Sequence, residues 1–407
     1  MEPLRAYVPQ WFAFANFIGA TQGRQMEPQS ANLSRRTVLA AGIASIGGLI
    51  ACRLGGSGPQ PGTDALPPGG LVIRNHRALD AEAPLSQLRS FLTPNENFFV
   101  RSHFGAPTSL PADWTLTIDG AIRREMTFSL EAIRRLGSAT HPITTECAGN
   151  GRGRFRLPRT GGVQWQYGAV GTAEWTGIPL ALLLDRAELL PDARHLWMEG
   201  LDHAPLPSVP KMLRSIPREL AVSDAFLAWE MNGQPIPLLH GGPLRLLTPG
   251  WFGMASTKWL THIHARPAVS DNYFMATGYR YADGSPVERL RVKSLITAPL
   301  AGARVRAGRI TVTGQAWSGL GAGGIRSVDV SLDDGRSWQP TRLTGKDYPY
   351  AWRGWEAELD ITGPGPQRLL ARATDRSGAT QPRTADPNPG GFGNNSMPEV
   401  QFDAARG

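Results

Sequence analysis

The sequence predicts an α+β protein of two domains, a mixed α/β domain followed by an all-β immunoglobulin-like sandwich. The chain has 407 residues and 41% of them are hydrophobic, which is ample for more than one core. Between about residues 71 and 286, strand-like and helix-like patterns are mixed. From 287 to 407 short strands recur with turns between them, which is typical of a sandwich.

The first 54 residues have the pattern of an export leader. Ser34-Arg35-Arg36-Thr37 is followed by an apolar run from Val38 to Ala51, which is too short to span a bilayer comfortably. We interpret this as a twin-arginine signal, which predicts that the folded chain is exported to the periplasm or another extracytoplasmic space. An ordinary N-terminal helix with two arginines is the alternative.

Two features of the leader stay open. Leu49-Ile50-Ala51-Cys52 is similar to a bacterial lipobox, and acylation of Cys52 would anchor the protein to a membrane without spanning it. Cleavage at another site would leave the same residues. Translation starts at either Met1 or Met26, and the Gly- and Pro-rich residues 55–70 are expected to form a linker.

Charge and cysteine content exclude some classes of function. The formal net charge is +8, but the basic residues are scattered, so nucleic-acid binding is disfavoured. A basic surface suited to an anionic substrate or an acidic partner is the better interpretation. Of the two cysteines, Cys52 lies in the leader, so a disulfide with Cys147 is not expected. No Cys-x-x-Cys-His motif for c-type haem occurs in the sequence.

The first domain is expected to alternate short strands with short helices. The expected strands cover residues 98–101, 114–119, 142–146, 195–200 and 244–248. Ser129 is the expected N-cap of a short helix that starts at 128–131. Pro179 suits the first turn of a helix that runs to about Glu188. Asn232-Gly233 indicates a hairpin turn.

The second domain is predicted from four strands and the turns between them. The strands are expected at 309–315, 325–332, 352–359 and 367–374. Asp333-Asp334-Gly335 and Asp375-Arg376-Ser377-Gly378 supply the turn residues. This spacing favours an immunoglobulin-like sandwich.

The clearest chemical signal is the segment from Thr144 to Arg154. Cys147 follows the strand at 142–146 and opens a glycine-rich turn, and Arg152 and Arg154 come just after it. Glycines let the backbone approach a bound group, arginines bind oxyanions through a fixed fork, and a thiolate is a metal ligand or a nucleophile. The alternative is that Cys147 is a small buried side chain, but its charged neighbours favour a functional thiolate.

This turn resembles the Cys-Ala-Gly-Asn turn that binds the metal in the sulfite oxidase family of molybdenum enzymes. Two more blocks of that family follow its order. Phe98-Phe99-Val100-Arg101-Ser102-His103 is similar to a block that contacts the pterin, with Ser102 in place of the usual Asn. The run from Ala228 to Leu260 is similar to the pterin-binding segment, and the resemblance extends from about residue 95 to 397, including a C-terminal dimerisation domain.

The resemblance implies a site built from one thiolate and several cations. Cys147 is the implied molybdenum ligand, Arg101 and Arg152 are implied to hold the oxygens of a sulfur oxyanion, and Tyr279 is implied to bind near the reacting oxygen. The residues implied to bind molybdopterin are Phe99, Val100, Arg101, Ser102, His103, Asp202, His240, Arg245, Ser256, Thr257 and Lys258. Asp202 could instead cap a loop, and Tyr279 could be a packing residue.

Two departures from the animal members of the family concern the substrate. Gly151 stands where they have the first of two arginines. Gly161-Gly162 stands in the region where they have a lysine, so Arg154 or Arg156 is a candidate for the missing charge.

The resemblance implies oxidation of sulfite to sulfate, transfer of the electrons to an external c-type cytochrome, and a homodimer formed through the C-terminal domain. The nearest alternative is a sulfane dehydrogenase subunit of a sulfur-oxidising multienzyme system. Methionine sulfoxide reductases of this kind lack the sandwich, and plant-type nitrate reductases add haem and flavin modules. The alternative from another class is a metal-free, lipid-anchored binding protein.

Overall fold

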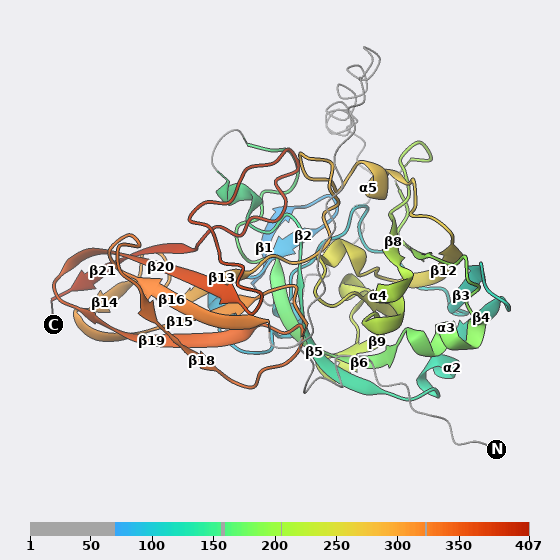
Figure 1. Cartoon of the computed structure of the whole chain (residues 1–407), viewed down its shortest axis with the longest axis horizontal. Helices are drawn as coiled ribbons and strands as arrows, with labels where there is room; N and C mark the ends of the chain where they lie inside the picture. Colours follow the sequence, from blue (N-terminus) through green and yellow to red (C-terminus); the bar gives the residue numbers. More distant parts are fainter. Residues whose placement is uncertain (1–69, 156–158, 205, 322–323, 407) are drawn as a thin grey trace, which may run out of the picture. The chain divides into compact units, whose positions relative to one another are not determined.

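The structure is a computed structural model that describes residues 70–155, 159–204, 206–321 and 324–406 (Figure 1). The predicted leader, with Cys52, and the linker up to residue 69 lie outside the described residues, as does Arg156. None of the helices in the described part of the chain combines the length and apolar character that a membrane span requires.

Two five-stranded sheets and one strand pair form the first domain. The sheet β10-β9-β6-β5, with β11 on β9, contains β5 (Ala139–Glu146), β6 (Val170–Pro179), β9 (Phe226–Met231), β10 (Gln234–Pro235) and β11 (Arg245–Leu247). The sheet β4-β3-β12-β7-β8 contains β3 (Thr115–Gly120), β4 (Met126–Ser129), β7 (His195–Gly200), β8 (Leu213–Pro217) and β12 (Leu260–Arg266). β1 (Val72–Asn75) pairs with β2 (Asp80–Glu82). The helices are α2 (Leu130–Arg134), α3 (Ala181–Ala187), α4 (Arg218–Ser223) and α5 (Tyr273–Ala276).

The second domain is all-β, as predicted. One sheet has the order β13-β15-β19-β18, from β13 (Lys293–Ala298), β15 (Gly308–Trp317), β18 (Arg342–Thr344) and β19 (Arg353–Ile361). The other has the order β14-β21-β20-β16-β17, from β14 (Arg304–Arg306), β16 (Ile325–Ser331), β17 (Gln339–Pro340), β20 (Gly365–Asp375) and β21 (Glu399–Ala405). Buried side chains of both sheets, such as Val312 and Leu369, share one hydrophobic cluster, which is the arrangement of a sandwich.

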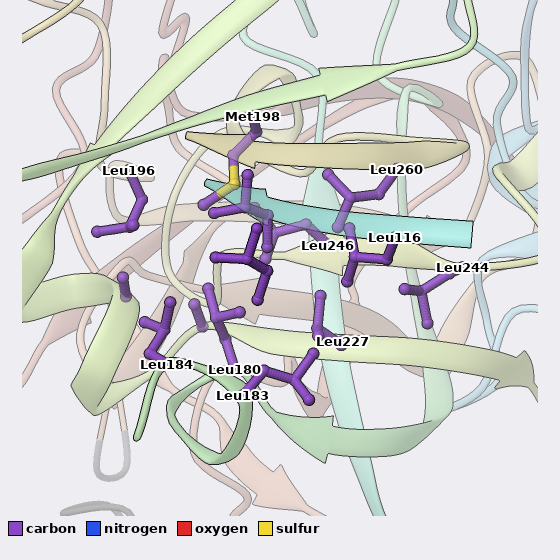
Figure 2. Packing of buried hydrophobic residues seen from close by; sticks show 14 of the residues in the cluster. Leu116, Leu180, Leu183, Leu184, Leu196, Met198, Leu227, Leu244, Leu246 and Leu260 are labelled. Carbon is purple, nitrogen blue, oxygen red and sulfur yellow. The ribbon is translucent and has the colours of Figure 1, made fainter. Parts of the chain in front are cut away.

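Strands and helices of the first domain direct apolar side chains into a shared core, which is its largest hydrophobic cluster among the described residues (Figure 2). Leu116 comes from β3, Leu196 and Met198 from β7, and Leu260 from β12. On β11, Leu246 points into this core, as does Leu244 just before the strand. Because side chains alternate along a strand, Arg245 between these two leucines faces the opposite side, where the candidate site lies.

Local sequence signals explain several element ends. The Ser129 hydroxyl accepts a hydrogen bond from the Ala132 amide at 3.2 Å, so it caps α2 as predicted. Asn232 and Gly233 have φ of 52° and 75°, which is the left-handed pair expected of the turn between β9 and β10.

One predicted element of the first domain is wrong, and one helix begins later than predicted. Residues 98–101 do not form a strand: Phe98, Phe99 and Val100 are all buried in succession, and Val100 alone pairs, with Ala81. The predicted helix begins at Ala181, because Pro179 is held extended opposite Phe226 as the last residue of β6.

Candidate active site

The predicted blocks meet at one cavity that opens to solvent. Predicted site residues that line it are Phe99, Arg101, Ser102, His103, Cys147, Asp202, Arg245, Ser256, Thr257, Lys258 and Tyr279. Ala148, Met212, Gly253, Met254 and Trp259 complete the lining. Three predicted residues, Val100, Arg152 and His240, do not line the cavity.

Cys147 is placed by the end of β5. Its amide donates to the Ala169 carbonyl at 2.9 Å, and its carbonyl accepts from the Asn150 amide at 2.9 Å, which closes the turn. Burial raises the pKa of the Cys147 thiol, while the charges of Arg101 and Arg152 act in the opposite direction. Cys147 therefore needs a strong positive partner to be a thiolate, and a metal ion is such a partner.

Arg101 supplies a permanent charge beside Cys147. Its Nη1 lies 3.1 Å from Oδ1 of Asp80, whose side chain is fully buried. Burial opposes the charge, but Asp80, Tyr279 and Cys147 together raise the pKa of Arg101. The guanidinium is therefore held charged and in one place. Sequence analysis missed Asp80, because it lies in a stretch of weak pattern that contains no motif.

Tyr279 and His103 form a neutral pair in the same cavity. The Tyr279 hydroxyl and His103 Nε2 share a hydrogen bond of 3.0 Å. Burial raises the pKa of Tyr279, and burial with the charge of Arg101 holds the pKa of His103 well below its usual range. Behind them, the guanidinium of Arg214 lies 5.3 Å from the centre of the Tyr279 ring. Sequence analysis missed Arg214, which carries no motif.

Lys258 and Arg245 place two buried cations at the cavity. Lys258 Nζ donates to the Ser102 hydroxyl at 2.6 Å and to the Leu239 carbonyl at 3.0 Å. Arg245 Nη1 donates to the His240 carbonyl at 2.9 Å, and its buried Nε has no hydrogen-bond partner within the described residues. Burial lowers the pKa of Lys258 to about 7 and that of Arg245 to about 10.

Other predicted residues shape the walls. His240 Nε2 lies 2.9 Å from the Asn95 carbonyl, so His240 supports the chain beneath Arg245 rather than the cavity itself. The Ser256 hydroxyl accepts from the Thr248 amide at 3.1 Å and ties the loop before Lys258. Burial raises the pKa of Asp202, and the charge of Lys258 acts in the opposite direction.

Arg152 is positioned differently from the prediction that it holds the oxygens of an anion. Its Nε donates to the Gly390 carbonyl at 3.0 Å, and its Nη1 donates to the Val163 carbonyl at 2.9 Å. The guanidinium also lies 5.4 Å from the centre of the Phe392 ring. Arg152 therefore does not line the cavity, but its positive charge acts to lower the pKa of Cys147. Arg154 is exposed and does not line the cavity.

Comparison with known proteins agrees with this geometry. Residues 103–274 match the oxidoreductase molybdopterin binding domain, and residues 285–403 match the Mo-co oxidoreductase dimerisation domain. The chain is 35% identical over 343 residues to sulfite oxidase of Gallus gallus, covering 78% of this chain and 74% of that protein. The chain belongs to the sulfite oxidase family. It is thus an oxidoreductase of the molybdopterin-dependent class.

Further similarities place this member of the sulfite oxidase family among its relatives. Mitochondrial sulfite oxidase of Homo sapiens is 32% identical over 342 residues, and this chain spans 62% of its length. The crystal structure of the sulfane dehydrogenase SoxCD from Paracoccus pantotrophus matches with a TM-score of 0.73 at 27% identity. That match covers 86% of this chain and 96% of the other.

The residues of the cavity fit the molybdenum cofactor of the family. A buried cation without an ion-pair partner is costly, and within the described ranges neither Arg245 nor Lys258 forms an ion pair. The partnerless Nε of Arg245 and the ammonium of Lys258 suit the phosphate of a pterin. Cys147 supplies a soft sulfur donor at the same cavity. These three residues would hold the cofactor at its phosphate and its metal.

The pKa of Lys258 leads to a prediction about anion binding. We expect sulfate to bind the metal-free protein about tenfold more weakly at pH 8 than at pH 6, because a lysine with a pKa of about 7 loses its charge over that range. A bound anion favours the charged form, so binding strengthens as pH falls. Titration calorimetry with sulfate, which stays divalent throughout, measures the change.

Lys258→Met is the control for this prediction. The variant should bind sulfate weakly at both pH values, with most of the pH dependence removed. His240 is not expected to contribute, because burial lowers its pKa to about 3. Equal sulfate affinity at pH 6 and pH 8 in the unaltered protein would contradict the role given to Lys258.

Proposed function

We propose that the protein oxidises sulfite to sulfate at a molybdenum centre bound by Cys147, and passes the electrons to an external c-type cytochrome. In balance, sulfite and water give sulfate, two protons and two electrons. The observation that carries the proposal is the convergence of Cys147, Arg101 and Tyr279 on one cavity. The molybdopterin binding domain supports the metal, and the relatives' names support oxidation of a sulfur compound.

The chain's own residues bind and orient the substrate. When bound, the molybdenum cofactor supplies oxygen transfer and two-electron redox chemistry. Arg101 attracts the anion, and its charge-assisted contact contributes roughly 1.5–3 kcal/mol. The hydrogen bond to His103 fixes the direction of the Tyr279 ring. Since Tyr279 stays protonated and His103 neutral, neither side chain repels the anion.

One specific observation favours the sulfane dehydrogenase alternative. Met212 and Met254 line the cavity. Arg152 does not line it, because two of its nitrogens donate hydrogen bonds to backbone carbonyls. Apolar, polarisable walls suit a neutral sulfane sulfur better than an oxyanion. The likeness to SoxCD over most of both chains points the same way.

Location, acceptor and assembly complete the proposal. The twin-arginine pattern at Arg35-Arg36 supports export of the folded chain to the periplasm, where c-type cytochromes are the natural acceptors. Acylation of Cys52 would hold the protein at a membrane surface. The match of residues 285–403 to a dimerisation domain supports a homodimer.

The test combines metal analysis with two substrates. Protein exported from its native host should contain about one molybdenum and one pterin per chain, and should reduce cytochrome c with free sulfite at a kcat of roughly 1–10³ per second. Faster reduction with a protein-bound persulfide than with sulfite would favour the sulfane dehydrogenase. A metal-free, pterin-free product without turnover would favour the binding protein.

A further inference from the structure

We propose that Lys293 and Glu146 are positioning residues, whose buried ion pair holds the Cys147 turn in place from the second domain. The second domain is then part of the active site as well as a dimerisation unit. The inference rests on the proposed function insofar as it takes Cys147 as the metal ligand. We call the Glu146, Asn150, Lys293 and Trp317 contacts the turn clamp.

The ion pair includes Glu146, the residue directly before the proposed metal ligand Cys147. Lys293, the first residue of β13, places Nζ 2.8 Å from Oε1 of Glu146, the last residue of β5, and both side chains are only 2% exposed. The other carboxylate oxygen accepts from Trp317 Nε1 at 2.8 Å. Both carboxylate oxygens of Glu146 are therefore bound by side chains of the second domain. This fixes the position of the residue that directly precedes Cys147.

The same lysine holds the far side of the turn. Lys293 Nζ donates to the Asn150 carbonyl at 3.1 Å, and Asn150 Nδ2 donates to Glu146 Oε1 at 3.0 Å. Asn150 Oδ1 in turn accepts from the Ala169 amide at 3.2 Å. Glu146 and Asn150 bracket Cys147, so one ammonium group fixes the two ends of the turn that carries the sulfur.

A second segment of the same domain contacts the turn at three further residues. The Gly393 amide donates to the Ala148 carbonyl at 2.8 Å. Asn394 Nδ2 donates to the Gly151 carbonyl at 2.8 Å, and the Gly390 carbonyl accepts from Arg152. The second domain therefore contacts the turn along most of its length, in addition to the ion pair.

General docking of two domains does not require a buried charge pair. Desolvating two charges offsets most of their attraction, and apolar side chains of similar size often serve stability as well. Buried aromatic rings such as Trp317 and Trp352 already pack there. The ion pair instead fixes the orientation of the cysteine turn, because both carboxylate oxygens and the ammonium group have defined partners at defined distances.

The test compares Glu146→Gln, Lys293→Met, the double variant and Gln315→Met. Gln315 is a matched control: its Nε2 donates across the same two domains to the Arg89 carbonyl at 2.9 Å but does not contact the turn. Glu146→Gln keeps size and shape, so it carries the test if Lys293→Met fails to fold. The first readout is the rate at which iodoacetamide alkylates Cys147 in metal-free protein, followed on its own peptide.

We expect Cys147 to react at least about fivefold faster in both single variants and within about twofold of wild type in Gln315→Met. In the metal-loaded protein, both single variants should lower kcat by about 10–100-fold with little change in KM, and shift the thiolate-to-metal absorption band. The double variant leaves no unpaired charge and should regain stability, but it also lacks the ion pair, so its kcat should stay about 10–100-fold below that of wild type.

Two results would overturn the turn clamp. One is wild-type reactivity of Cys147 in both Glu146→Gln and Lys293→Met. The other is an equal change in Gln315→Met, which would show a general docking role. If wild-type protein proves to have no molybdenum and no turnover, the proposed function fails, while alkylation of the metal-free protein still decides whether the clamp exists.

Discussion

Replacing Cys147 with serine is expected to abolish sulfite oxidation and to leave the fold intact. A serine hydroxyl does not lose its proton near neutral pH and is a harder ligand than a thiolate, so the metal loses its one protein sulfur. The loss of kcat should exceed the roughly 10–100-fold that removal of an outer-shell partner costs. Turnover, molybdenum content and thermal unfolding measure the three parts of this prediction.

Cys52→Ser is the matched control, because Cys52 is the only other cysteine of the chain. It should keep full turnover in the purified protein, whether or not its location changes. Substantial sulfite oxidation by Cys147→Ser would show that the ligand is assigned to the wrong residue.

Arg101→Gln is the second change with a large expected effect. It removes the charge that faces the substrate, and loss of one such electrostatic group costs about 10²–10³ in rate. It also leaves the fully buried Asp80 without its cation, although Asn75 still donates to this carboxylate at 2.9 Å. We therefore expect the free energy of unfolding to fall by about 3 kcal/mol, the lower end of the range for a broken buried pair.

The double variant Asp80→Asn/Arg101→Gln separates these two effects. Without the buried carboxylate the free energy of unfolding should return close to that of wild type, whereas kcat/KM should stay low. Chemical denaturation and steady-state kinetics on the same samples provide both values. Recovery of kcat/KM in the double variant would mean that Arg101 serves the fold and not the substrate.

Most of the candidate site could be predicted because its chemistry lies in contiguous blocks. Cys147 in its glycine-rich turn and Lys258 after a loop each carry a local pattern, and the structure brings both to one cavity. The sandwich could be predicted because its strands and turns repeat at short spacing. Each of these inferences needs only residues that are close in sequence.

What could not be predicted depends on partners far away in sequence. Asp80 and Arg214 are isolated charges whose importance comes from Arg101 and Tyr279, and nothing beside them indicates it. The direction of Arg152 is set by the carbonyl of Gly390, in the other domain. The strand expected at 98–101 was wrong because a buried apolar run does not distinguish a strand from a packed loop.

The long-range contacts of the cysteine turn also set an order of assembly. Asn394 reaches Gly151 across 243 positions of the chain. A ribosome makes residue 394 long after residue 151, so the contacts around the sulfur stay incomplete until this part of the second domain has been made. We therefore expect metal loading to follow synthesis of this segment, and a chain that ends before Gly390 should accumulate without its metal.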